Sequence, residues 1–138
     1  MQHTKTKTIV GRILSGLVGL FLIGASGVPK FIDWPGKQEM MDRMGIPLSL
    51  LPTIGVIEIS VAVLYLIPRT SFLGAIFATG LLGGAVFTHL RVGDGLFEIL
   101  FPVILGVILW IGLALRHPLL FGLTLGNWRK TEPTNEPN

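Results

Sequence analysis

Four apolar runs constrain this 138-residue chain more than any other feature of its sequence; they cover residues 9–28, 48–67, 72–90 and 96–115. Each is close to the about 20 residues that an α-helix needs to cross the hydrocarbon core of a bilayer, about 30 Å thick. Half of the chain is hydrophobic and 14% is charged, and the apolar residues lie in blocks instead of at the spacing of a soluble core. The sequence therefore predicts an all-α integral membrane four-helix bundle, formed by residues 9–118.

The segments outside the four runs are short and differ in character. Residues 1–8 form a polar, basic lead. Residues 119–138 begin with an apolar stretch that is too short to span, which we interpret as an interfacial segment, and end in a polar tail expected to be disordered. We expect the first run to be a retained span and not a cleaved signal peptide, because it is long and further spans follow it.

The basic residues predict the orientation of the bundle. Four spans place both termini on one side, and seven basic residues then lie on that side: Lys5, Lys7, Arg12, Arg69, Arg116, Arg129 and Lys130. Four lie on the opposite side: Lys30, Lys37, Arg43 and Arg91. The excess predicts that both termini are cytoplasmic. The net charge of +3 is a consequence of these flanking residues, so it does not indicate binding to nucleic acid.

Small residues indicate where helices approach one another. Gly11, Ser15 and Gly19 are four residues apart in the first run and form a smooth stripe on one helix face. Gly80 and Gly84 form a GxxxG pair in the third run, which predicts that this helix lies at the crowded centre of the bundle.

The long connection on the outer side, residues 29–47, predicts a short helix. Trp34-Pro35-Gly36 is typical of a turn, and residues 38–44 read as two helical turns ended by Gly45. Three methionines, Met40, Met41 and Met44, share one face of this helix. It is either an interfacial helix on the outer mouth of the bundle or a flexible lid over a ligand cavity.

Glu58 is the principal candidate for a functional residue. It lies in the middle of the second run, where a carboxylate costs several kcal/mol unless it has a partner, water or a proton. The topology places Lys30, His89 and Arg91 near the outer end, toward which Glu58 can reach. Hydrogen bonds from Ser26, Thr53 or Thr88 are possible additions. The alternative is a buried ion pair that only fixes helix packing.

Several chemistries are not supported by the sequence. The chain has no cysteine, which excludes an internal disulfide relay or thiolate metal site. The topology places His89 outside and His3 and His117 inside, so the histidines cannot share one ion or haem. No Ser-His-Asp arrangement and no phosphate-binding loop are present. We therefore predict no catalytic residue and no metal site.

Four motifs in order resemble the DoxX-like family of small four-helix bacterial membrane proteins, over about residues 9–118. They are Gly27-x-x-Lys30-Phe31, Leu51-Pro52-x-x-Gly55-x-x-Glu58, Leu66-Ile67-Pro68-Arg69-Thr70 and Gly80-x-x-Gly83-Gly84-Ala85-x-x-Thr88-His89-x-Arg91. The resemblance implies a location in the bacterial cytoplasmic membrane and marks Glu58, Thr88, His89 and Arg91 as family landmarks. The wider superfamily includes subunits of thiosulfate:quinone oxidoreductase, although the lack of cysteine disfavours a thiol-based role here.

These observations favour a membrane protein that binds a hydrophobic small molecule, such as a quinone, or that serves as an accessory subunit of a membrane redox complex. The expected ligand-binding residues are Lys30, Glu58, Thr88, His89 and Arg91. Three alternatives stay open: an enzyme acting alone, which lacks a visible electron carrier or nucleophile; a structural or assembly protein without a ligand; and a small transporter that works as a homo-oligomer. The expected partners are membrane lipid and a redox protein.

Overall fold

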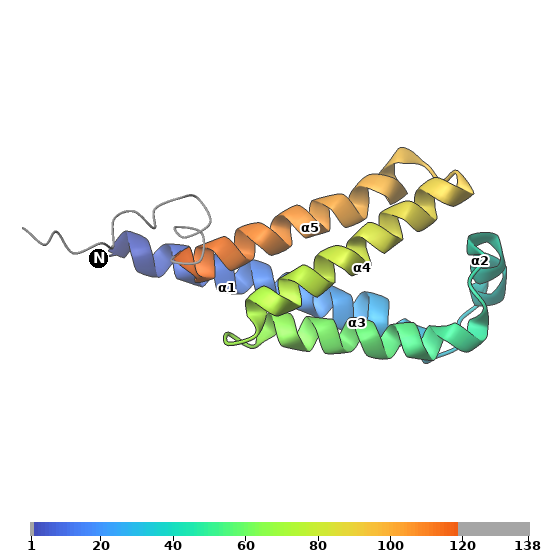
Figure 1. Ribbon diagram of the computed structural model, residues 1–138, viewed down its shortest axis with the longest axis horizontal. Helices are drawn as coiled ribbons and strands as arrows, with labels where there is room; N and C mark the ends of the chain where they lie inside the picture. The colour runs from blue at the N-terminus through green and yellow to red at the C-terminus, as the bar shows by residue number, and fades with distance from the viewer. Residues whose placement is uncertain (1, 119–138) are drawn as a thin grey trace, which may run out of the picture.

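A computed structural model describes residues 2–118, with side chains from residue 5 onward, and the described chain is helical and contains no strand. Helix α1 (Gln2–Leu20) continues into a π-helical segment (Phe21–Gly27) and a 3₁₀ turn (Val28–Lys30). The short helix α2 (Lys37–Met44) follows. A 3₁₀ turn (Leu48–Leu50) leads into α3 (Leu51–Leu66), and α4 (Ser71–Val92) and α5 (Leu96–Arg116) complete the chain order (Figure 1).

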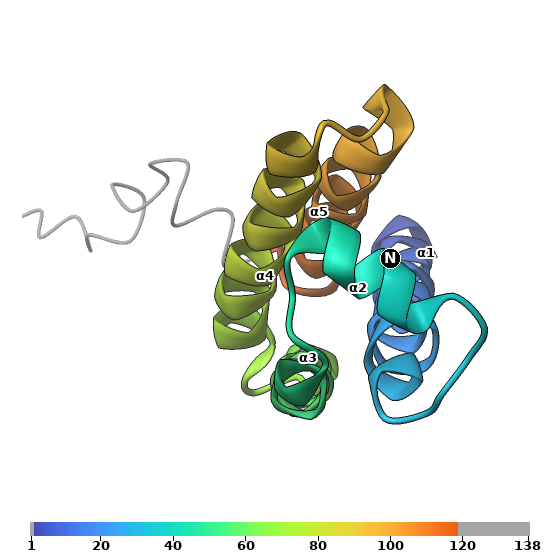
Figure 2. The same ribbon diagram turned by 90° about the vertical axis from the view of Figure 1, so that its right-hand side faces the viewer.

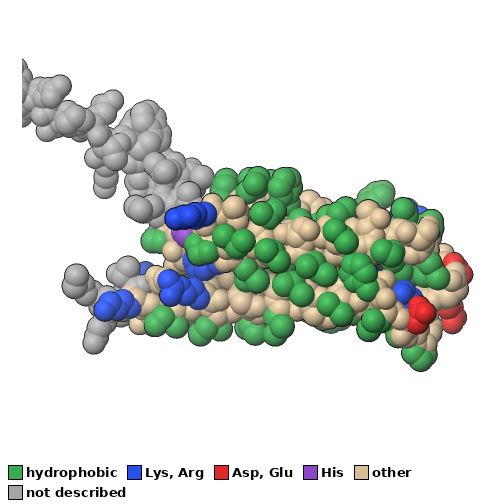
Figure 3. Space-filling model, turned by 90° about the horizontal axis from the view of Figure 1, so that it is seen from below, with side chains coloured by type: hydrophobic (Ala, Val, Ile, Leu, Met, Phe, Trp, Pro, Cys, Tyr) green, Lys and Arg blue, Asp and Glu red, His purple; other side chains and the backbone are tan. Residues whose placement is uncertain are grey.

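Four of the helical segments are long and apolar enough to cross a membrane: Lys5–Lys30, Leu48–Leu66, Ser71–Val92 and Leu96–Arg116. The prediction of an all-helical bundle with four spans is confirmed. The predicted polar lead is helical from Gln2 and extends α1, whereas the predicted interfacial segment and tail, residues 119–138, lie outside the described residues. Lys and Arg side chains gather at the end of the bundle where the chain starts, and acidic side chains gather at the opposite end (Figure 3). We call these the basic end and the acidic end.

The helices pack in the order α1, α5, α4 and α3, and α3 closes the ring against α1 and its π-helical continuation. Small residues allow the close approaches near the basic end. Gly11 lies against the backbone of α5, and Gly74 lies against the backbone at Tyr65. The Tyr65 hydroxyl hydrogen-bonds Ser15 Oγ at 2.9 Å and donates to the carbonyl of Leu109 at 2.8 Å, which joins α3 to α1 and α5. This half of the bundle is therefore tightly closed.

The other half is open. The sequence predicts that Gly80 and Gly84 lie where helices crowd together, and this prediction is wrong. A Cβ built on Gly80 or Gly84 would meet no atom within 4 Å, so neither residue is at a helix contact. The small residues that do pack in α4 are Gly74, Ala75 and Ala78, which are buried nearer the basic end. Helices α3 and α4 lie side by side at their hairpin and separate toward the acidic end, where α2 lies across the bundle (Figures 1 and 2).

Candidate functional site

A cavity of about 970 Å³ occupies the open half of the bundle. This volume is at the upper end of the about 300–1,000 Å³ that is usual for small-molecule sites. Its walls come from the end of the first span, from α2 and from α3 and α4, and most of them are apolar. The polar side chains that line it are Ser26, Lys30, Trp34, Lys37, Glu58, Ser60, Thr88 and His89.

The π-helical segment positions two of these polar side chains. At its end, the N–H of Val28 donates to the carbonyl of Ile23, five residues earlier, which is the hydrogen bond of a π-helix. Proline usually ends a helix, but the first span continues past Pro29, which lies in the first turn of a 3₁₀ segment that reaches Lys30. Proline is tolerated here because the first turn of a helix does not need its N–H. Ser26 and Lys30 thus both reach the cavity from one helix end.

Glu58 forms an ion pair with Lys30 at the cavity wall. Lys30 Nζ donates to Glu58 Oε2 at 2.6 Å, and it also donates to the carbonyl oxygen of Ser26 at 2.8 Å and to Ser26 Oγ at 3.3 Å. Ser26 Oγ donates to the same carboxylate oxygen at 3.1 Å. The side chains of Lys30 and Glu58 are 19% and 15% exposed. The charge of Glu58 is therefore balanced, and Oε1 receives no hydrogen bond from the described part of the chain.

Helix α2 covers the end of the cavity. Its three methionines, Met40, Met41 and Met44, all line the cavity. Gly45 ends the helix in the left-handed conformation, with φ of 63°, as the sequence predicts. Lys37, at the start of α2, donates to the carbonyl of Ile32 at 2.8 Å and holds the preceding loop. Of the two interpretations of α2, this geometry favours a methionine-lined cover.

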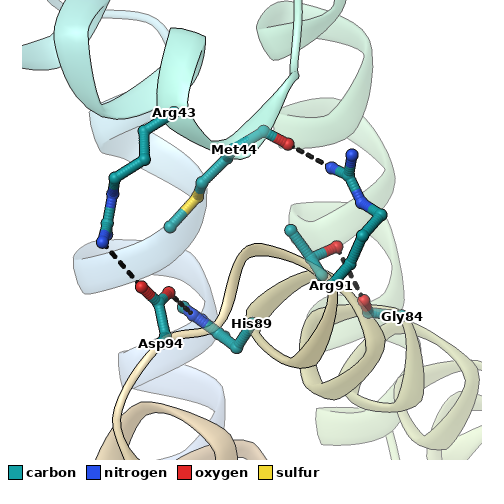
Figure 4. Close-up of polar contacts among 7 residues, drawn as sticks. Arg43, Met44, Gly84, His89, Arg91 and Asp94 are labelled. Carbon is teal, nitrogen blue, oxygen red and sulfur yellow. Dashed lines mark hydrogen bonds and ion pairs between the residues drawn. The ribbon is translucent and has the colours of Figure 1, made fainter.

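Two sets of contacts attach α2 to the end of α4 (Figure 4). Asp94, in the turn after α4, accepts from Arg43 Nη1 at 2.6 Å and pairs with His89 Nδ1 at 2.6 Å. Arg91 donates to the carbonyl of Met44. The hydrogen bond with His89, together with the charge of Arg43, holds the pKa of Asp94 below its usual value. The carboxylate therefore stays ionised and keeps α2 attached at neutral pH.

The predicted site residues divide into two groups. Lys30, Glu58, Thr88 and His89 line the cavity, while Arg91 does not line it and binds the end of α2 instead. Thr88 Oγ1 donates to the carbonyl of Gly84 at 2.9 Å, within its own helix, and not to Glu58. Sequence reasoning missed the contribution of Lys37 and Ser60, because nothing local in the sequence distinguishes them from interfacial polar residues.

Among the side chains of residues 5–118, no three His, Asp or Glu lie close enough together to hold a metal ion. Glu58 and His89 line the same cavity, but His89 is paired with Asp94 and Glu58 with Lys30. The arrangement can offer hydrogen bonds and a balanced charge to one end of an apolar molecule.

The chain matches a family model over residues 13–112, and that model describes the DoxX-like family. No curated protein and no solved structure matches it at a significant level. The matched segment includes the end of the first span, α2, α3, α4 and most of α5, so it contains every residue of the cavity. The chain therefore belongs to the DoxX-like family.

Proposed function

We propose that the protein binds a quinone-like hydrophobic molecule in this cavity, with the polar end of the molecule against Lys30, Ser26 and Glu58. The observation that carries the proposal is the location of the ion pair. It lines a large, mostly apolar cavity in a membrane-spanning segment. A pair that only fixed helix packing would not need an open cavity beside it.

The charges favour an uncharged polar head. Lys30 and Glu58 neutralise each other at 2.6 Å, so a charged ligand would have to enter without a free counterion, which is costly in an apolar site. Glu58 Oε1 can accept a hydrogen bond from a hydroxyl, as in a quinol. Lys30 can donate to a carbonyl if it exchanges one of its bonds to Ser26, as in a quinone. An accessory role beside a redox partner is compatible with such binding.

The orientation that we propose places both termini in the cytoplasm of a bacterium. Seven basic residues, among them Arg12, Arg69 and Arg116, belong to the side of the two termini and four to the opposite side, and by the positive-inside rule this excess favours a cytoplasmic location for the basic end. The cavity then lies in the outer half of the inner membrane.

Thermal unfolding with added decylubiquinol tests the proposal. A ligand at 100 times its Kd stabilises a folded protein by about 2.7 kcal/mol, so the Tm of the wild type should rise clearly. Without ligand, the double variant Lys30→Met/Glu58→Leu should have a Tm close to that of the wild type. With ligand, its Tm should rise little. Glu98→Gln removes an exposed carboxylate that does not line the cavity, so this control should shift like the wild type.

Two results would count against the proposal. One is the absence of any shift with the wild type, together with the absence of quinone in lipid extracted from the purified protein. The other is an equal shift for the wild type and the double variant. Either result would favour a structural role for the ion pair.

A further inference from the structure

The cavity opens sideways, through the side of the bundle that α3 and α4 form. Val56 of α3 and Phe77 of α4 line the cavity and are 56% and 48% exposed, so the cavity reaches the outer surface of the bundle at both helices. Both residues lie within membrane-spanning segments. The surface at this opening therefore faces lipid acyl chains and not water.

Glycines form the α4 side of the opening. Gly80 and Gly84 line the cavity, and no atom lies within 4 Å of a Cβ built on either of them. They are thus not required for helix contact. Their effect is to leave a channel along α4 where larger side chains would fill the space between α3 and α4.

The end of the cavity nearest the aqueous phase is closed by α2. Arg43 pairs with Asp94, and Arg91 binds the carbonyl of Met44. The side chain of Met44 is buried, at 6% exposure. A ligand coming from water would have to break these contacts, whereas a ligand coming from the bilayer would not.

We infer that the ligand is a bilayer-dissolved amphiphile with an uncharged hydrogen-bonding head and a single apolar tail, and that it enters between α3 and α4 past Gly80 and Gly84. The inference rests on the proposed function. The head reaches Glu58 and Lys30, and the tail stays in the opening, in contact with Val56, Phe77 and the surrounding lipid. Helix α2 remains in place throughout.

Leucine substitutions in α4 test the route, with the protein in lipid nanodiscs. Quenching of tryptophan fluorescence reports binding, because Trp34 lines the cavity. Gly84→Leu, and independently Gly80→Leu, should slow association of decylubiquinone by about tenfold or more, within the range by which single substitutions alter association rates. Gly83→Leu is the matched control: it adds the same side chain to the same helix, at an exposed position that does not line the cavity. Its rate should equal that of the wild type.

Two further measurements separate this route from entry through the acidic end. Arg43→Ala removes one attachment of α2 and should leave the association rate within about twofold of the wild type. The tail-less 2,3-dimethoxy-5-methyl-1,4-benzoquinone should bind more weakly than decylubiquinone to the wild type, and Gly84→Leu should reduce that difference.

The outcomes distinguish the two proposals. If the wild type binds decylubiquinone but Gly80→Leu and Gly84→Leu associate as fast as Gly83→Leu, sideways entry is wrong and the proposed function stands. The same conclusion follows if Arg43→Ala accelerates association strongly. If the wild type binds neither quinone, the proposed function fails, and the entry route fails with it.

Discussion

The ion pair between Lys30 and Glu58 allows a quantitative test by a double-mutant cycle. Glu58→Leu leaves the Lys30 ammonium with only its two contacts to Ser26, and Lys30→Met leaves the Glu58 carboxylate with only Ser26 Oγ. Removing one member of a fully buried pair costs about 3–5 kcal/mol. The two side chains keep 15–19% exposure and are therefore not fully buried, so we expect a smaller cost of about 2 kcal/mol for each single variant.

The double variant Lys30→Met/Glu58→Leu removes both charges and places apolar side chains in a mostly apolar wall. Such replacements are often close to neutral, so we expect it to lie within about 1 kcal/mol of the wild type. The two single losses sum to about 4 kcal/mol, and the coupling energy is therefore at least about 3 kcal/mol, at the upper end for contacting residues. This recovery is the reason that the double variant can be used for ligand binding.

The measurement is the free energy of unfolding in mixed detergent micelles, followed by circular dichroism as the denaturing detergent is increased. Glu98→Leu serves as the control, because Glu98 is exposed in the first turn of α5 and its loss should cost less than about 1 kcal/mol. A coupling energy below about 0.5 kcal/mol would refute the reasoning. It would mean that the two groups do not depend on each other in the folded protein.

Three other changes have definite expected results. Gly74→Ala should lower the free energy of unfolding by about 2 kcal/mol or more, because its Cβ would overlap the backbone nitrogen of Tyr65, whereas Gly80→Ala meets nothing and should cost nothing in the same micelle assay. Tyr65→Phe loses the hydrogen bonds to α1 and α5 and should cost about 0.6–1.7 kcal/mol by that assay, as for other hydrogen bonds between membrane helices. The hydrogen bond with His89 lowers the pKa of Asp94. The ionised Asp94 side chain therefore stabilises the folded protein fully above the ordinary pKa of 3.8, and this stabilisation is lost as the pH falls below that value. The Tm of the wild type should decline in that pH range, and the Tm of Asp94→Asn should change less. Equal costs for the two glycines, no loss for Tyr65→Phe or parallel pH profiles would contradict these expectations in turn.

The fold class follows from the sequence because membrane spans are a local property. A run of about 20 apolar residues must form a helix in lipid, where every backbone polar group has to be satisfied within the segment. The same argument makes Glu58 a candidate, since one carboxylate in such a run is costly wherever the helix packs. Alternation of the spans is enough to place Lys30 and His89 at the same end of the bundle, so the sequence predicts part of the cavity lining as well.

The details of the site depend on contacts between distant segments, which composition and spacing do not reveal. The sequence contains small residues along the first and third spans, but only packing decides that Gly74 contacts the backbone at Tyr65 while Gly80 and Gly84 contact nothing. Arg91 likewise has the spacing of a site residue, yet it binds the end of α2.

What the sequence by itself determined is the membrane class, the four spans and the single costly carboxylate, because each follows from transferring one segment into lipid. What only the tertiary structure decided is the cavity. Its existence depends on the close approach of α3 and α4 at one end and their separation at the other, and on a π-helical segment that brings Ser26 and Lys30 to Glu58. The contacts of Glu58 with Ser26 and Lys30 join residues 32 and 28 positions apart in the chain, so they form only when separate helices pack against each other.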